Sequence, residues 1–214
     1  MSNKVYFQIE RIAFFSDAVF AIAITLLIIE IHPPVFTVET TADETYQAFL
    51  HLLPELVAVL VSFALISLNW RRHHQLFGFM DDYDEKLITL NFFSLVAIIF
   101  LPFSTAFISK NYARFWPDPL SLPFVVYCIN NLACAFFNFL LFRYALDPEN
   151  RLFDPAAAPN YKRIKLEVLY PVFVFAAAAI VGYYSPFVAL ACFALFALEP
   201  LFIKLVLQKN GEKT

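Results

Sequence analysis

Residues 10–31 combine groups that can do chemistry with a long apolar run. Arg11, Ser16 and Asp17 lie in the first third of the run, and Thr25 lies deep inside it. A carboxylate in such a place can accept hydrogen bonds from neighbouring helices, or it can titrate or bind an ion. Both interpretations of Asp17 are open from the sequence, and we favour the first.

The hydrogen-bond donors expected for Asp17 end the second apolar run of the chain. They are Trp70, Arg71, His73 and His74. Adjacent histidines on a helix point about 100° apart, so this pair is poorly placed to chelate one metal. We therefore expect a structural network of hydrogen bonds at this level and no metal site.

The composition excludes an ordinary soluble domain. Of 214 residues, 61% are hydrophobic and only 15% are charged, and the mean hydropathy is +0.67; soluble domains carry about 25% charged residues. The net charge of −3 argues against a nucleic-acid partner. No Gly-rich phosphate loop, H-E-x-x-H or C-x-x-C sequence occurs, so we predict a membrane protein that is not an enzyme.

Apolar runs of about 20 residues can cross a bilayer as helices. Pro-rich and charged segments separate the runs, for example HPPVF (32–36) and WPDP (116–119). The prediction is a single all-α transmembrane domain over residues 1–214. Its six spans are expected at 11–31, 49–70, 87–108, 120–142, 166–184 and 187–207.

The distribution of basic residues predicts the orientation. With the N-terminus in the cytoplasm, 13 of the 15 Lys and Arg fall on the cytoplasmic side, and only Lys110 and Arg114 fall outside. Both termini are therefore predicted to be cytoplasmic. A cleaved signal peptide is not expected at the N-terminus, because Asp17 interrupts its apolar region.

The first predicted helix has two functional faces. At 3.6 residues per turn, Ile22, Leu26 and Ile29 follow the i, i+4, i+7 pattern and form one aliphatic stripe. Thr25 lies on the flank of this stripe, whereas Asp17 falls on nearly the opposite side of the helix. The acid and the stripe should therefore face different neighbours.

Uncharged polar residues inside the spans also need partners. The Thr25 hydroxyl is expected to bond the backbone carbonyl of Ala21, four residues earlier. Asn130, Asn131 and Asn138 in the fourth span are expected to form hydrogen bonds between helices.

The sequence Arg11-x-x-x-Phe15-Ser16-Asp17, with Thr25 eight residues after the acid, resembles the start of the endolysosomal potassium channel family and its prokaryotic relatives. Further similarities follow in the second and third spans. They are Asn69-Trp70, His73-His74, Asn91 and Leu101-Pro102-Phe103-Ser104.

This resemblance implies a homotetramer in a prokaryotic cell membrane, with four copies of the first helix around a central pore. It implies a pore constriction at Ile22, Leu26 and Ile29, with Thr25 beside the narrow part. It also implies a polar network that holds the pore helix in place. The members of that network would be Arg11, Phe15, Ser16, Asp17, Trp70 and one of His73 and His74.

The function expected from these features is a potassium-permeable channel with modest preference for K⁺ over Na⁺. No TVGYG-type filter sequence occurs, so side chains must form the selective part of the pore. K⁺ would be the permeant ion, and no cofactor is expected. The alternative is a proton-coupled transporter with Glu199 as the carrier, although no convincing internal repeat supports it.

Overall fold

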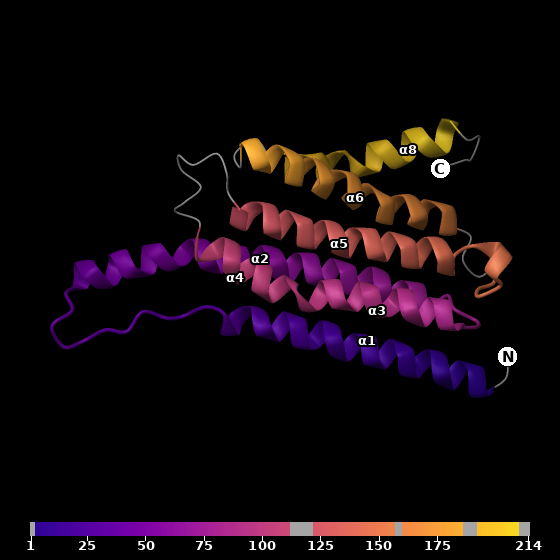
Figure 1. The fold of residues 1–214 in the computed structure, drawn as a ribbon, viewed down its shortest axis with the longest axis horizontal. Helices are drawn as coiled ribbons and strands as arrows, with labels where there is room; N and C mark the ends of the chain where they lie inside the picture. Colours follow the sequence, from indigo (N-terminus) through magenta and orange to yellow (C-terminus); the bar gives the residue numbers. More distant parts are fainter. Residues whose placement is uncertain (1–2, 112–121, 157–159, 186–191, 210–214) are drawn as a thin grey trace.

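The computed structural model describes residues 3–111, 122–156, 160–185 and 192–209. Its long helices lie side by side along one common direction, from α1 at one face to α6 and α8 at the other (Figure 1). In chain order the helices are α1 (Asn3–Ile29), α2 (Ala42–Phe77), α3 (Glu85–Ile99), α4 (Leu101–Ser109), α5 (Leu122–Ala145), α6 (Tyr161–Tyr184) and α8 (Glu199–Lys209). Short 3-10 helices lie at Pro148–Asn150 and Phe193–Leu198.

Five membrane spans are supported by the described residues. Phe7–Ile29, Ala42–Phe77, Glu85–Ser109, Leu122–Ala145 and Tyr161–Tyr184 are long and apolar enough to cross a bilayer. These helices confirm the all-α membrane architecture and match the first five predicted spans. Residues 120–121, at the predicted start of the fourth span, lie outside the described part of the chain.

The sixth predicted span, 187–207, is not a single long helix where the structure describes it. Residues 187–191 lie outside the described ranges, and the remainder divides into the six-residue 3-10 helix and the 11-residue α8. Pro200 follows the first residue of α8 and cannot donate a helical hydrogen bond there. Six spans, cytoplasmic termini and a single domain therefore stay predictions.

One face of α1 is buried against its own subunit. Ile9, Ser16, Phe20, Ala23 and Leu27 are all at most 5% exposed and recur at intervals of three, four or seven residues. This spacing aligns them along one side of a helix, and that side packs against α2, α3 and α4. The described residues leave the opposite side of α1 largely exposed, as the 59% and 66% exposure of Ile22 and Ile29 shows.

The third predicted span, 87–108, is divided into α3 and α4 by Phe100. The cause is Pro102, which has no N–H to continue the helical ladder. Asn130 of α5 compensates at this break, because its Nδ2 donates to the Ala97 carbonyl at 2.9 Å. The Ser104 hydroxyl in turn donates to Asn130 Oδ1 at 2.7 Å.

A second asparagine of α5 joins three helices. Asn138 donates through Nδ2 to Asn69 Oδ1 of α2 at 2.6 Å, and its Oδ1 accepts from the Ser94 hydroxyl of α3 at 2.6 Å. Asn131 differs, because its side chain donates through Nδ2 to the carbonyl of Tyr127 in its own helix at 2.9 Å. The expectation of bonds between helices is thus confirmed for Asn130 and Asn138 and wrong for Asn131.

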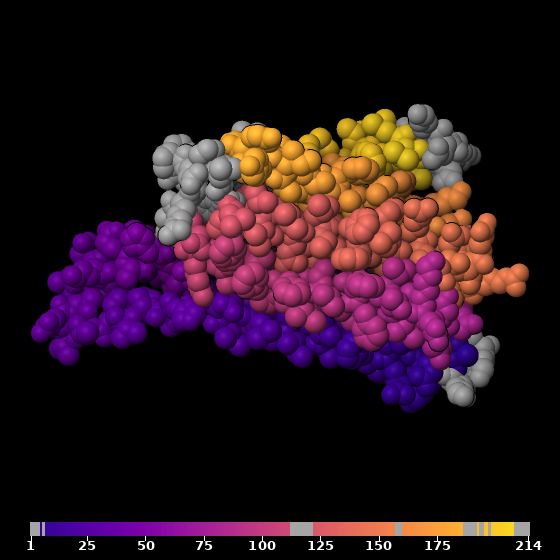
Figure 2. Space-filling view, in the orientation of Figure 1, coloured from indigo at the N-terminus to yellow at the C-terminus, as the bar shows by residue number. Residues whose placement is uncertain are grey.

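Helix α2 is much longer than the predicted span 49–70 that it contains. Its 36 residues correspond to about 54 Å. The N-terminal part of α2 and the segment before it extend beyond the other helices (Figures 1 and 2). A capping box begins the helix, because Thr41 Oγ1 accepts from the Glu44 N–H at 3.3 Å and Glu44 Oε2 accepts from the Thr41 N–H at 2.8 Å.

Candidate functional site

A buried chain of hydrogen bonds joins α1, α2 and α3. Asn91 of α3 donates through Nδ2 to the Ser16 hydroxyl at 2.9 Å, and the Ser16 hydroxyl donates to the Ile12 carbonyl at 2.9 Å. The Nε2–H of His73 on α2 donates to Asn91 Oδ1 at 2.7 Å. Ser16, His73 and Asn91 are each at most 1% exposed. This chain fixes the buried face of α1 to two neighbouring helices.

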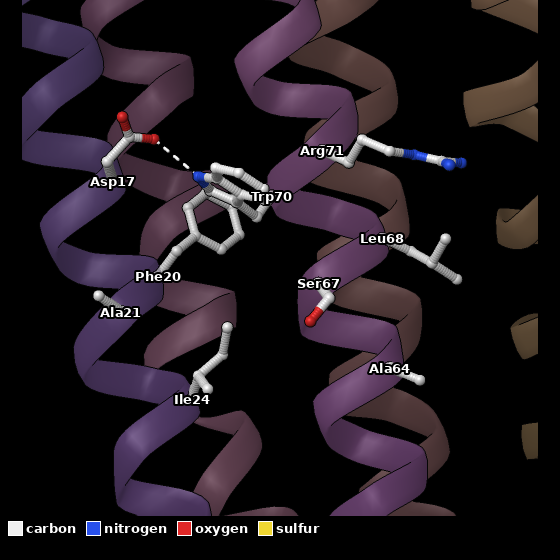
Figure 3. A pocket seen from close by; sticks show the side chains of 9 residues that line it. All are labelled: Asp17, Phe20, Ala21, Ile24, Ala64, Ser67, Leu68, Trp70 and Arg71. Carbon is white, nitrogen blue, oxygen red and sulfur yellow. Dashed lines mark hydrogen bonds between the residues drawn. The ribbon is translucent and has the colours of Figure 1, made fainter.

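A second contact holds α1 at the same level. The indole Nε1–H of Trp70 donates to Asp17 Oδ1 at 2.8 Å, as Figure 3 shows. Trp70 also stacks on His74, with 5.6 Å between ring centroids. A groove of about 810 Å³ runs beside this bond between α1 and α2, and Phe20 and Ile24 of α1 line it. Asp17 thus accepts a hydrogen bond from a neighbouring helix, the first of the two interpretations of this residue.

The other predicted network residues lie close by but make different contacts. His73 is the histidine that enters the hydrogen-bond chain. Phe15 packs edge-on against Phe92 of α3, with centroids 5.9 Å apart. Arg11 is exposed, and its guanidinium lies 5.9 Å from the Phe7 ring centroid. Within the described ranges no hydrogen bond or ion pair joins Arg11 to the network.

The aliphatic stripe occupies the uncovered side of α1. Ile22, Leu26 and Ile29 are 59%, 39% and 66% exposed, whereas the buried face of the same helix is almost fully covered. Thr25 is exposed beside them, and its hydroxyl donates to the Ile22 carbonyl at 2.9 Å. The expected acceptor, the carbonyl of Ala21, was therefore wrong by one residue. Because the hydroxyl donates its proton to the backbone, the Thr25 oxygen keeps its lone pairs for another partner.

Two features of the site were not predicted from the sequence. In the sequence Asn91 is only one of the residues similar to the channel family, whereas in the structure it connects Ser16 to His73. Glu30 follows the last residue of the stripe and forms an ion pair with Lys110 after α4, with 3.3 Å between Oε2 and Nζ. The signal that could have identified Asn91 is its place as a polar residue inside the apolar span 87–108.

The bond between Trp70 and Asp17 can be measured with a double-mutant cycle. Trp70→Phe, Asp17→Leu and the double variant are compared by their free energies of unfolding. We expect a coupling energy of about 1 kcal/mol between the two residues. A carboxylate acceptor strengthens the hydrogen bond, but the partial exposure of the pair to solvent weakens it. Additive single effects would show that this bond does not stabilise the helix pair.

Comparisons with known proteins identify what this arrangement resembles. A family model described as the endosomal/lysosomal potassium channel TMEM175 matches residues 11–102, which contain α2, α3 and most of α1. A potassium channel of Chamaesiphon minutus is 39% identical over 100 residues, or 47% of this chain and 49% of that protein. A potassium channel of Streptomyces collinus is 37% identical over 103 residues, or 47% of each chain. The aligned region thus spans about half the length of these two relatives.

The fold extends the similarity over nearly the whole chain. The crystal structure of a lysosomal potassium-selective channel TMEM175 homolog from Chamaesiphon minutus matches with a TM-score of 0.72 and 26% identity. The match covers 92% of this chain and 98% of the other. These relatives are ion channels by name and not enzymes, in agreement with the prediction from the sequence.

Proposed function

Because the chain belongs to the family of the endosomal/lysosomal potassium channel TMEM175, we propose that it is a potassium-permeable cation channel of the cell membrane. Four copies of the chain surround one pore, and α1 of each copy lines it. One observation carries this proposal. The side of α1 that bears Ile22, Leu26 and Ile29 is uncovered, while the opposite side is packed and hydrogen-bonded within the subunit.

The pore lining must act through side chains. The backbone carbonyls of a continuous helix are already engaged, and α1 is unbroken from Asn3 to Ile29. Four Ile22 side chains that converge on an axis form an apolar constriction, and Leu26 and Ile29 continue it. Such a constriction restricts conduction by excluding water and by its size.

Selectivity follows from the cost of removing water from the ion. K⁺ is less strongly hydrated than Na⁺, so it loses less free energy where the pore is apolar and narrow. The Thr25 oxygen lies beside the stripe with free lone pairs and offsets part of that loss. These groups support a modest preference for K⁺ and not the strong selectivity of rings of carbonyls.

A proton-coupled transporter is not favoured. The relatives are channels by name. Glu199, the candidate carrier, forms an ion pair with Arg72 at 3.2 Å, and both side chains are mostly buried. Loss of one member of such a pair is costly, which argues for a structural role of Glu199.

Planar bilayer recordings of the purified protein test the proposal. With KCl on one side and NaCl on the other, we expect a current that reverses toward the K⁺ equilibrium potential. Protein-free bilayers provide the control for leak. Saturable flux that collapses together with a proton gradient, or a current that reverses at zero voltage, would contradict the potassium channel.

A further inference from the structure

A second cavity lies on the side of α2 that faces away from α1. It has a volume of about 490 Å³ and is enclosed by α2, α5, α6 and the junction between the 3-10 helix and α8. This volume is in the usual range of small-molecule sites, about 300–1,000 Å³. The proposed pore does not use this cavity.

The lining of the cavity changes from apolar to charged along α2. Leu65 and Leu68 lie in the last third of the predicted span 49–70, and Arg71, Arg72 and Gln75 follow one to two turns later. The basic residues are at the end of the helix that the charge distribution predicts to be cytoplasmic. The part of the cavity wall that α2 forms is therefore apolar at one end and charged at the other.

Helix α6 and the C-terminal segment also change from apolar to charged residues toward the predicted cytoplasmic end of the bundle. On α6, Phe175 lies deep in the bundle, and Glu167 lies two turns closer to the start of the helix. In the C-terminal segment, Phe196 precedes Glu199, whose carboxylate reaches Arg72. Three separate segments therefore build one amphipathic cavity.

Among the described residues that line the cavity, one basic side chain has no ion-pair partner. Glu199 is paired with Arg72 at 3.2 Å, and Glu167 is paired with Arg163 of the same helix at 2.9 Å. Arg71 is exposed and has no ion pair among the described residues. Arg71 and Leu68 line both this cavity and the groove beside α1, and Figure 3 shows both side chains directed away from α1. An unpaired guanidinium at the edge of the membrane favours a phosphate, which it can bind through two parallel hydrogen bonds.

We propose that this cavity binds one phospholipid, with its phosphate on Arg71 and one acyl chain along Leu65, Leu68 and Phe175. The phosphate supplies the anion that Arg71 lacks, and the apolar walls cover the upper part of the chain. Glu167 and Glu199, each already paired with an arginine, line the same polar end of the cavity. Binding at this site should depend on both the phosphate and the acyl chain of the lipid, whereas a general lipid-facing surface needs only the chains.

Native mass spectrometry of the delipidated protein in detergent tests this site without any measurement of conduction. The probes are phosphatidylglycerol, a diacylglycerol with the same chains, and inorganic phosphate. The variants are Arg71→Gln, Leu65→Trp, which fills the apolar end, and Arg143→Gln. The last is the matched control, because Arg143 is an exposed arginine at the same end of the bundle outside the cavity.

The wild-type protein should retain phosphatidylglycerol, and neither diacylglycerol nor millimolar phosphate should replace it. Arg71→Gln should weaken retention by about tenfold, as expected for a charge-assisted hydrogen bond. Leu65→Trp should also weaken it, whereas Arg143→Gln should bind like the wild type. Equal losses in Arg71→Gln and Arg143→Gln, equal retention of diacylglycerol, or displacement by inorganic phosphate would each overturn the lipid site.

Discussion

Ile22→Asn is expected to raise single-channel conductance and to reduce the preference for K⁺ over Na⁺. In the proposed pore, the asparagine amide binds water where the isoleucine excludes it, so the barrier to ion passage at this position should fall. A decrease of about 1.4 kcal/mol corresponds to about tenfold in the rate of ion passage. Single-channel recordings and reversal potentials in a K⁺/Na⁺ gradient measure both effects.

Ile28→Asn is the matched control for this variant. Ile22 and Ile28 are 59% and 58% exposed on the same helix, so both substitutions introduce the same group at equally accessible positions. The two side chains point about 120° apart on α1, so only Ile22 belongs to the stripe. Wild-type conductance and reversal potential in Ile22→Asn, or an equal change in Ile28→Asn, would show that Ile22 does not form the constriction.

Asn91→Leu is expected to be the most destabilising single change in the polar network. It removes the bonds to Ser16 and His73 at once and leaves the buried imidazole without its partner. Hydrogen bonds between membrane helices are modest individually, but a stranded buried group adds to the loss, so we expect about 1–3 kcal/mol. The thermal unfolding midpoint of the purified protein in detergent reports the difference.

Asn131→Leu makes the same substitution at another buried asparagine. Asn131 is 2% exposed, but its hydrogen bond to the Tyr127 carbonyl remains within α5, so its loss does not disconnect two helices. The midpoint should fall clearly less than in Asn91→Leu. If both variants lose the same stability, the bonds of Asn91 between helices contribute nothing specific.

The membrane spans were predictable because hydropathy and charge report directly on the solvent of a helix. The first five spans follow the apolar runs to within a few residues, except that α2 extends beyond its run at both ends. Helix α2 begins at Ala42, before the predicted start at residue 49, because a capping box and not apolarity begins it. The T-A-D-E sequence at 41–44 carries that signal. Likewise, Pro102 in the sequence indicates the break that divides α3 from α4.

The faces of α1 were also predictable, because they depend only on helical spacing. The separation of Asp17 from Ile22 follows from five residues at 100° each. The hydrogen-bond partners of the polar side chains were harder to predict. The link from His73 through Asn91 to Ser16 depends on how three helices pack, which no local pattern determines. The choice of the Ile22 carbonyl by Thr25 depends on one side-chain rotamer.

The length of α2 divides the molecule into parts of unequal local stability. A bilayer core is about 30 Å thick, so a helix of about 54 Å must continue well beyond the lipid. There its backbone amides lie near water, and the cap at Thr41 contributes only about 1 kcal/mol. Amide protons in this extension can therefore exchange through local opening, while those near Asn91 exchange only when the bundle itself opens. Local opening at the Thr41 end of α2 therefore leaves the hydrogen bonds of Asn91 to Ser16 and His73 intact.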